Sequence, residues 1–239
     1  MTLEVVVETC GDALEAEAGG ADQIEVKCDY LEYGLTPTAG MLAEICGMVS
    51  CDVLCMVRPH ARSNVYSSLD IAAMVRDIHT AKILPIKGFL LGCLTADNQL
   101  DLKSLEYLQE AAGDLDLHFH LAWELTKDPF QTLKQLVTLG FKSVRTSGGD
   151  GISGQAGENF NRIIEYADFL QGDLDLFLAG GITVNNIAEI ISATGINNVH
   201  SGSGVREPNT RTGKVSGNLV QAMKLAMDST SPGNTSAEG

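Results

Sequence analysis

Eight short apolar or alternating segments recur along the chain, at residues 3–8, 23–28, 52–58, 87–92, 117–122, 143–146, 175–179 and 197–201. Longer segments lie between them, in which apolar residues recur at spacings of three and four, as in DALEAEAGGAD, LKSLEYLQEAAGD and TVNNIAEIISATGI. Short apolar or period-two runs indicate strands, whereas spacings of three and four indicate amphipathic helices. The pattern therefore predicts strand and helix in alternation.

Strands and helices that alternate within one domain favour parallel strands joined by right-handed crossovers, and eight such units close into a barrel. The predicted fold class is thus α/β, a (β/α)8 TIM barrel domain over residues 1–227. Helix ends agree with this pattern, since Asp128 precedes a proline as an N-cap would, and Gly140 and Gly195 stand where helices stop. Residues 228–239 have almost no apolar side chains and are predicted to form a disordered tail.

Charge narrows the range of partners. The chain of 239 residues carries 16 Lys and Arg against 31 Asp and Glu, a formal net charge of −15 at pH 7. Such a charge repels nucleic-acid phosphates and anionic membrane surfaces, so neither is expected as a partner. No segment reaches the roughly 20 apolar residues of a membrane span. The expected ligand is therefore a small molecule or a metal ion.

The six cysteines lie in the first half of the chain and include no CxxC pair. A chain of this length does not need disulfides to stabilise its core, so reduced thiols are the simplest interpretation. No basic leader precedes the first predicted strand. Together these observations predict a cytoplasmic protein.

Charged side chains and a histidine stand near the ends of four predicted strands. Side chains in a barrel strand alternate between the interior and the helix layer, and the C-terminal strand ends form the mouth. By this alternation we expect five catalytic candidates to share one cavity: Glu8, Glu25, Lys27, Arg58 and His120. Burial and mutual fields would shift their pKa values into a useful range. The alternative is an internal salt-bridge network that only fills the barrel.

Glycine-rich segments follow the last three predicted strands. Glycines let backbone N–H groups approach an anion, and barrel enzymes often bind phosphate with these loops. The candidate anion-binding residues are Thr146, Ser147, Gly148, Gly149, Gly180, Gly181, Gly202, Ser203 and Gly204. Lys27, Arg58 and Arg206 are the nearby cations expected to attract an anion. Tight turns between strand and helix are the alternative interpretation of the glycines.

The pattern defines no metal site, so the metal ligands stay undetermined. His118 and His120 share one face of the fifth predicted strand, and the third histidine that could join them is His200 on the eighth. Cys51 and Cys55 lie four residues apart on one strand, which separates them by roughly 13 Å at about 3.3 Å per residue. That distance is too long for both thiolates to bind one ion.

Several motifs occur in a fixed order between about residues 1 and 204: LEVVVE, AEAGGADQIEV, YGLTPTAG, MVRP, GCLTADNQLD, FHLAWELTKDP, RTSGGDG, and AGGIT with NVHSG. In that order and spacing they resemble the CutC family, described as copper homeostasis proteins built on a (β/α)8 barrel. The resemblance implies a role in copper homeostasis, with copper as the bound ion, and it is compatible with a homodimer.

The chain departs from the family pattern at several positions. Lys27 stands where a cysteine usually follows the IEL segment, and Cys28 falls one position later, on the opposite face. His60 replaces the second arginine of the usual RPR, while Leu121 and Glu124 replace the arginine and the aspartate of the usual FHRAFD. A thiolate copper site on the second strand is therefore not expected, and the ligand could differ from that of the family.

Three functions follow from these observations. The first is copper(I) handling, in which thiolate, thioether or imidazole groups bind the ion. The second is an enzyme that acts on a small phosphorylated or carboxylated metabolite, with Glu25 or His120 as acid or base. The third is a non-catalytic scaffold. The residues favour the enzyme, whereas the family resemblance favours copper.

Overall fold

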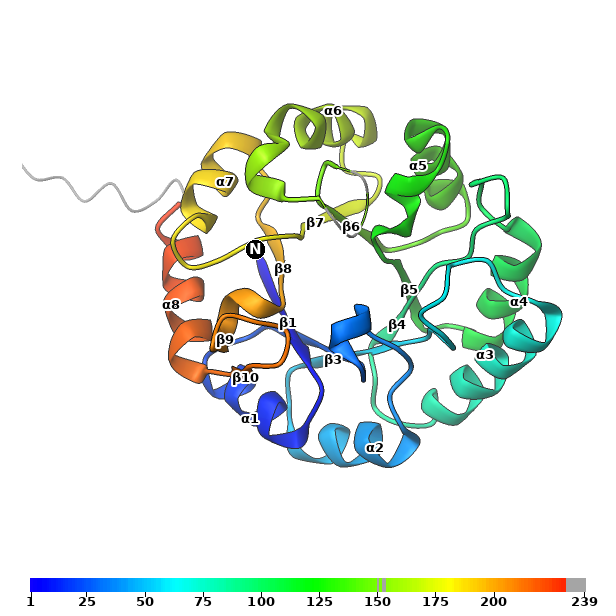
Figure 1. The fold of residues 1–239 in the computed structure, drawn as a ribbon, viewed down its shortest axis with the longest axis horizontal. Helices are drawn as coiled ribbons and strands as arrows, with labels where there is room; N and C mark the ends of the chain where they lie inside the picture. The colour runs from blue at the N-terminus through cyan, green and yellow to red at the C-terminus, as the bar shows by residue number, and fades with distance from the viewer. Residues whose placement is uncertain (150, 152–153, 231–239) are drawn as a thin grey trace, which may run out of the picture.

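Eight parallel strands close into a barrel in the computed structural model of the protein, which describes residues 1–149, 151 and 154–230. Each strand pairs with the next one along the chain, and β8 pairs with β1 to complete the ring (Figure 1). The (β/α)8 barrel predicted from the sequence is therefore confirmed. The strands of the ring are β1 Thr2–Val7, β2 Gln23–Val26, β3 Asp52–Met56, β4 Gly88–Leu91, β5 Asp116–Phe119, β6 Ser143–Thr146, β7 Asp175–Leu178 and β8 Asn198–Ser201.

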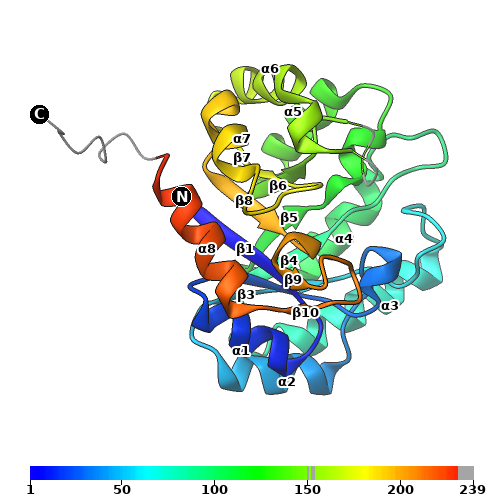
Figure 2. The same ribbon diagram turned by 60° about the vertical axis from the view of Figure 1, so that its left-hand side comes forward.

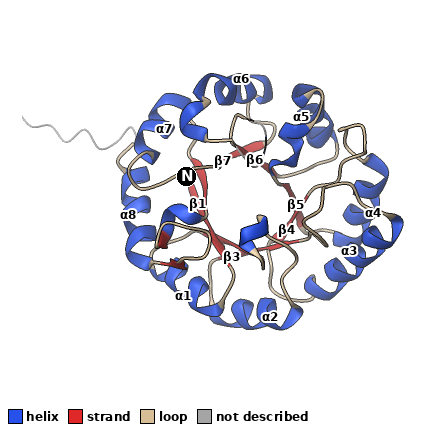
Figure 3. Ribbon diagram, viewed as in Figure 1, coloured by secondary structure: helices blue, strands red, loops and turns tan. Residues whose placement is uncertain are grey.

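An α-helix follows each strand of the ring, and the helices form the outer layer (Figure 3). They are α1 Cys10–Ala18, α2 Ala39–Met48, α3 Ser68–Ala81, α4 Leu102–Ala112, α5 Pro129–Thr138, α6 Phe160–Leu170, α7 Ile187–Thr194 and α8 Gly217–Asp228. Short 3-10 helices lie in the connecting loops: η1 Tyr30–Glu32, η2 Leu121–Leu125, η4 Ala156–Glu158 and η5 Ser203–Val205. The loops at the strand ends are thus partly ordered by local structure.

Helix ends follow the capping residues in the sequence. Asp128 Oδ1 accepts a hydrogen bond from Gln131 N, with Pro129 at the first position of α5. Gly140 and Gly195, with φ of 76° and 73°, take the left-handed conformation that favours glycine just beyond α5 and α7. These residues set where strand and helix alternate.

Side chains of each strand alternate between two regions. On β1, Leu3, Val5 and Val7 belong to the apolar core between the barrel and the helices, whereas Glu4 and Val6 face the interior of the barrel. Glu4 has no exposed surface. The barrel interior therefore contains charged groups that must be neutralised by their neighbours.

A small hairpin, β9 Arg206–Glu207 and β10 Lys214–Val215, follows β8 and lies at the same end of the barrel as η1 (Figure 2). The Arg206 guanidinium is buried, where it donates to the carbonyl oxygens of Gly213 at 2.6 Å and Val6 at 3.0 Å and faces Asp12 Oδ2 at 3.5 Å. Val215 N donates to Asp12 Oδ1 at 3.1 Å. The base of the hairpin is therefore attached to β1 through Val6 and to the first turn of α1 through Asp12.

Helix α8 ends at Asp228, which is one residue inside the segment expected to be a tail, and residues 231–239 lie outside the described part. Among the helices of the described residues, none has the length and apolar character needed to cross a membrane.

Replacement of Asp12 by alanine should lower the free energy of unfolding by about 3 kcal/mol, because it leaves the buried guanidinium of Arg206 without its carboxylate. Urea denaturation followed by circular dichroism measures the change. Asp114→Ala, at an exposed position of the loop before β5, is the control and should stay close to wild type. Equal stabilities of Asp12→Ala and the wild type would show that this pair does not anchor the hairpin.

Candidate functional site

A pocket of about 250 Å³ opens at the C-terminal ends of the barrel strands. The polar side chains that line it include Glu25, Lys27, Tyr30, Tyr33, Arg58, His120, Arg145, His200 and Arg211. The glycine-rich loops after β7 and β8 line it with Gly180, Gly181, Gly202, Ser203 and Gly204. Charged groups from several strands thus meet backbone from the last two loops.

The structure brings together four of the five catalytic candidates, which are Glu25, Lys27, Arg58 and His120. Glu8 does not line the pocket. It lies just beyond the end of β1, and its Oε1 accepts a hydrogen bond from Tyr30 N at 2.8 Å, at the start of η1. Its visible role is to hold this short helix beside the mouth.

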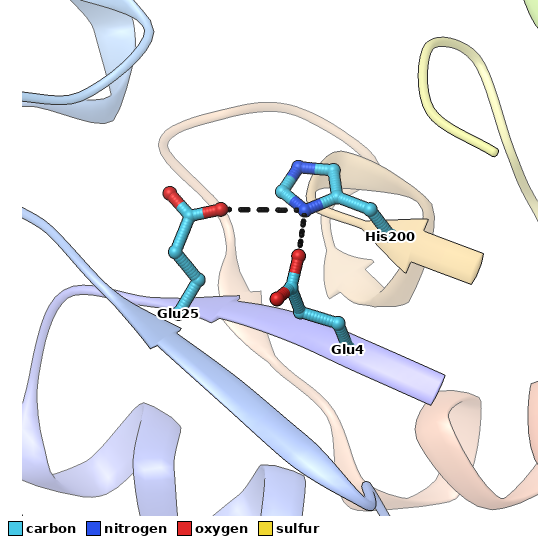
Figure 4. A group of neighbouring side chains, drawn as sticks. All are labelled: Glu4, Glu25 and His200. Carbon is cyan, nitrogen blue, oxygen red and sulfur yellow. Dashed lines mark hydrogen bonds and ion pairs between the residues drawn. The ribbon is translucent and has the colours of Figure 1, made fainter. Parts of the chain in front are cut away.

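Two carboxylates and an imidazole meet where β1, β2 and β8 lie side by side (Figure 4). His200 Nδ1 lies 2.6 Å from Glu4 Oε1 and 3.3 Å from Glu25 Oε2. Figure 4 shows the other ring nitrogen turned away from both carboxylates. Because a neutral imidazole that donates through Nδ1 carries its lone pair on Nε2, His200 can accept a proton at Nε2.

Each of the two carboxylates also has a cationic partner. Arg145 Nε donates to Glu4 Oε1 at 3.0 Å, and its Nη2 contacts Oε2. Lys27 Nζ lies 2.5 Å from Glu25 Oε1. Burial raises the pKa of Glu4, but Arg145 and His200 lower it further, so its pKa lies well below the usual range. Glu4 is therefore a permanent anion that fixes the imidazole of His200.

His120 is a hydrogen-bond donor rather than a base. Its Nδ1 accepts from Ala122 N at 3.2 Å, which leaves the proton of the neutral ring on Nε2. Burial, together with the charges of Arg58 and Lys27, lowers the pKa of His120 to about 3. Among the described residues, Nε2 is buried without a hydrogen-bond partner. At neutral pH this N–H is available to a ligand.

The loop after β6 binds a carboxylate of the chain itself. Glu124 Oε1 accepts from Thr146 Oγ1 at 2.7 Å and from the N–H groups of Ser147 and Gly148 at 2.9 Å, while Oε2 accepts from Ser147 Oγ at 2.6 Å. Gly149 N donates to Ser147 Oγ. These four candidates for anion binding do not line the pocket. Burial outweighs the hydrogen bonds and raises the pKa of Glu124 to about 7.

The anion-binding candidates after β7 and β8 line the pocket, and their glycines contact different groups. A Cβ added at Gly204 would lie 1.8 Å from the carbonyl oxygen of Ile182, so this glycine permits close packing of two backbone segments. Beside Gly202 and Gly181 lie the side-chain oxygens of Tyr30 and Gln155. Within the described part of the chain, the N–H groups of Gly181 and Gly202 donate to no acceptor.

The sequence model of the CutC family matches residues 1–205. The chain belongs to the CutC family. It is 34% identical over 198 residues to the human copper homeostasis protein cutC homolog, which covers 83% of this chain and 71% of the relative. It is also 34% identical over 207 residues to a family protein CutC of Salmonella schwarzengrund, covering 86% of this chain and 81% of the relative.

One solved structure agrees with the CutC assignment, and another shares the fold. The crystal structure of the putative copper homeostasis protein CutC from Streptococcus agalactiae has a TM-score of 0.78 and 27% identity, and covers 84% of this chain and 98% of that one. KGPDC from Streptococcus mutans has a TM-score of 0.64 at 10% identity, covering 96% of this chain and 98% of that one, which shows the fold alone.

Copper, the ion that the CutC relatives' names imply, can be tested against the donors of the pocket. Copper(I) prefers soft sulfur ligands, but among the described residues the sulfur donor of the lining is Met56, and no cysteine belongs to it. Glu4, Glu25 and His200 place one donor atom each within 4.8 Å of the others, yet Arg145 and Lys27 already neutralise both carboxylates. The described residues of this CutC pocket therefore lack the cluster of sulfur ligands that copper(I) prefers.

Sequence reasoning did not select several residues of the site, namely Glu4, Arg145, His200, Tyr30, Tyr33 and Arg211. A usable signal existed for Glu4 and Arg145. Each is a charge inside a short buried strand, and such a charge requires an opposite one nearby. Arg211 lies in a polar loop, where no periodicity shows which way a side chain points.

Glu124 should make the stability depend on pH. Its pKa is about 7 in the folded protein and 4.5 as the ordinary value, so the folded state binds the proton more tightly. The free energy of unfolding should therefore fall as pH rises from about 4.5 to 7, by about 3 kcal/mol at 1.36 kcal/mol per pKa unit.

The variant Glu124→Gln cannot ionise and isolates this effect. His118 and His120 also titrate, but they contribute equally to both proteins and cancel in the difference. The difference in unfolding free energy, wild type minus variant, should fall between pH 4.5 and 7 and stay constant above. Urea denaturation at several pH values measures it, and a difference independent of pH would contradict the raised pKa.

Proposed function

We propose that this protein is a barrel enzyme that catalyses acid–base chemistry on a small anionic metabolite. The observation that supports the proposal most directly is the pair His200 and Glu25 in the pocket lining, with the buried Glu4 in contact with the same imidazole. A buried carboxylate that holds one nitrogen of an imidazole, with the other nitrogen directed at a pocket, is suited to proton transfer. A network that only filled the barrel would not need to present Nε2.

Each residue of this group has a separate task in the proposed reaction. His200 Nε2 accepts a proton from a C–H or O–H group of the substrate. The imidazolium so formed lies between the carboxylates of Glu4 and Glu25, which stabilise its charge. The ammonium of Lys27 and the Nε2–H of His120 donate hydrogen bonds to a substrate oxygen that gains negative charge during the reaction. Glu4 acts through His200 and is a positioning residue.

The pocket also favours an anionic ligand. The hydrogen bonds of Arg58 go to backbone carbonyl oxygens, including those of Glu32 at 2.7 Å and Gly34 at 3.0 Å. Among the described residues no carboxylate pairs with this guanidinium, so its charge is not neutralised. The N–H groups of Gly181 and Gly202 are further donors for an anion at the last two loops. This positive region lies in a chain of net charge −15.

His200→Asn should lower turnover by about 10²–10⁴-fold, the usual contribution of general acid–base catalysis. Exchange of substrate C–H for deuterium, followed by proton NMR across a panel of sugar phosphates and hydroxycarboxylates, measures the rate. Glu4→Gln should lower the same rate, because the amide no longer stabilises the imidazolium. His79→Asn, exposed on α3, is the control. No exchange by the wild type with any compound would favour the scaffold instead.

Copper(I) handling is the second candidate, because the relatives are named as copper homeostasis proteins. The structural observation in its favour lies outside the pocket, where Cys10 Sγ lies 3.8 Å from Met41 Sδ. Both sulfur atoms are soft donors of the kind that copper(I) prefers. The cytoplasmic location and the homodimer expected from the sequence stay predictions.

The variant Cys28→Ser should bind copper(I) as tightly as the wild type. Cys28 Sγ donates to the carbonyl oxygen of Thr36 at 3.1 Å, and burial raises the pKa of its thiol, which disfavours the thiolate. Competition with a chromophoric copper(I) chelator measures both affinities, and Cys10→Ser gives the comparison at the other sulfur pair. A large loss of affinity in Cys28→Ser alone would assign copper to the end of β2.

A further inference from the structure

The hairpin that follows β8 places an arginine over the mouth of the barrel. Arg211 lies between β9 and β10 and lines the pocket. Its Cζ atom lies 3.7 Å from the centroid of the Tyr33 ring and 6.0 Å from that of Tyr30. A guanidinium at this distance stacks on an aromatic face, which fixes its plane and leaves its edge free.

Arg211 differs from the other arginines of the region in its partners. Arg145 pairs with Glu4, and Arg206 faces Asp12. Among the described residues, no carboxylate forms an ion pair with Arg211 and no acceptor receives a hydrogen bond from it. All its N–H donors are therefore available, in the fork geometry that matches a phosphate or carboxylate group.

The aromatic platform beneath Arg211 is held in place from several sides. Tyr33 has φ of 67°, a left-handed conformation that costs a non-glycine residue about 1–2 kcal/mol. Such a conformation persists when its surroundings enforce it. Glu8 fixes the backbone of Tyr30, whose ring faces Lys27 Nζ at 5.2 Å and Arg206 Cζ at 5.3 Å. The platform is thus one short segment, Tyr30 to Tyr33, that contacts Glu8 after β1 and Arg206 in the hairpin.

We propose that Arg211 is the residue that binds the anionic group of the substrate, and that this group is a phosphate monoester. The inference rests on the proposed function and names its ligand class. Two cations of the pocket, Arg58 and Arg211, lack a carboxylate partner among the described residues, which matches the two negative charges of a phosphate monoester. Arg211 lies beyond residues 1–205, the segment that the family model matches.

Phosphate affinity of matched variants tests this assignment. Thermal melting is recorded against the concentrations of inorganic phosphate and of glycerol 3-phosphate, at constant ionic strength, because a ligand of the native state raises the melting temperature with occupancy. Arg211→Gln should bind both probes at least tenfold more weakly than the wild type. Arg76→Gln, which removes the same charge at an exposed position of α3, should bind as the wild type does.

The phosphate affinities of two Tyr33 variants provide a second test. Tyr33→Phe keeps the aromatic face and should retain most of the affinity, whereas Tyr33→Ala should lose it as Arg211→Gln does. The melting temperature of each variant without ligand shows whether it is folded, and circular dichroism confirms its helix content.

The outcomes separate the two proposals. Phosphate-dependent melting of the wild type with an equal shift in Arg211→Gln would overturn the role of Arg211 and leave the proposed anionic substrate standing. No shift of the wild type with either probe, beyond that seen with sodium chloride, would overturn both. A shift that Arg76→Gln loses as fully as Arg211→Gln would show that overall charge, rather than this residue, attracts the anion.

Discussion

The carboxylate of Glu4 must be neutralised inside the barrel, and the polar interior is arranged around this requirement. The Glu4 side chain has no surface exposed to water. An isolated charge in such a buried position is strongly unfavourable. Arg145 reaches it from β6, and Gln23 and His200 donate to it from the strands on either side of β1. Strands that are distant in the chain are thereby joined through one anion, and removal of either charge would leave the other buried and unpaired.

The same requirement links the stability of the barrel to its proposed chemistry. His200 takes its orientation from Glu4, and Glu25 approaches the imidazole from β2 while Lys27 balances its charge. Within this network Glu4 and Arg145 pair with each other in the barrel interior. His200 lines the pocket, and its Nε2 atom is turned away from both carboxylates. An interior salt-bridge network and the proposed active site are therefore compatible for these residues, because the network would fix the geometry of the site.

The sequence predicts the wall of the site better than its loops. Strand alternation places Glu25 correctly in the pocket lining, because within a strand the side-chain direction repeats every two residues. The rule fails at Glu8, one residue beyond β1, where the backbone leaves the strand and the carboxylate turns to η1. Sequence patterns also could not show that Glu124 would occupy the donors after β6, or that Arg211 would stack on Tyr33. Both contacts join segments that are brought together only when the barrel closes, so local sequence patterns do not predict them.

The hairpin after β8 combines a buried base with an exposed turn. Arg206 and Val215 attach the base to Asp12 in the first turn of α1, whereas residues 207–210 and 212 are exposed. Substitutions or insertions in this turn can therefore change what stands over the pocket without repacking the barrel. Divergence of ligand preference among related barrels would be expected to accumulate first at this turn, and a directed-evolution library placed there would vary the ligand contacts while preserving the proposed acid–base residues.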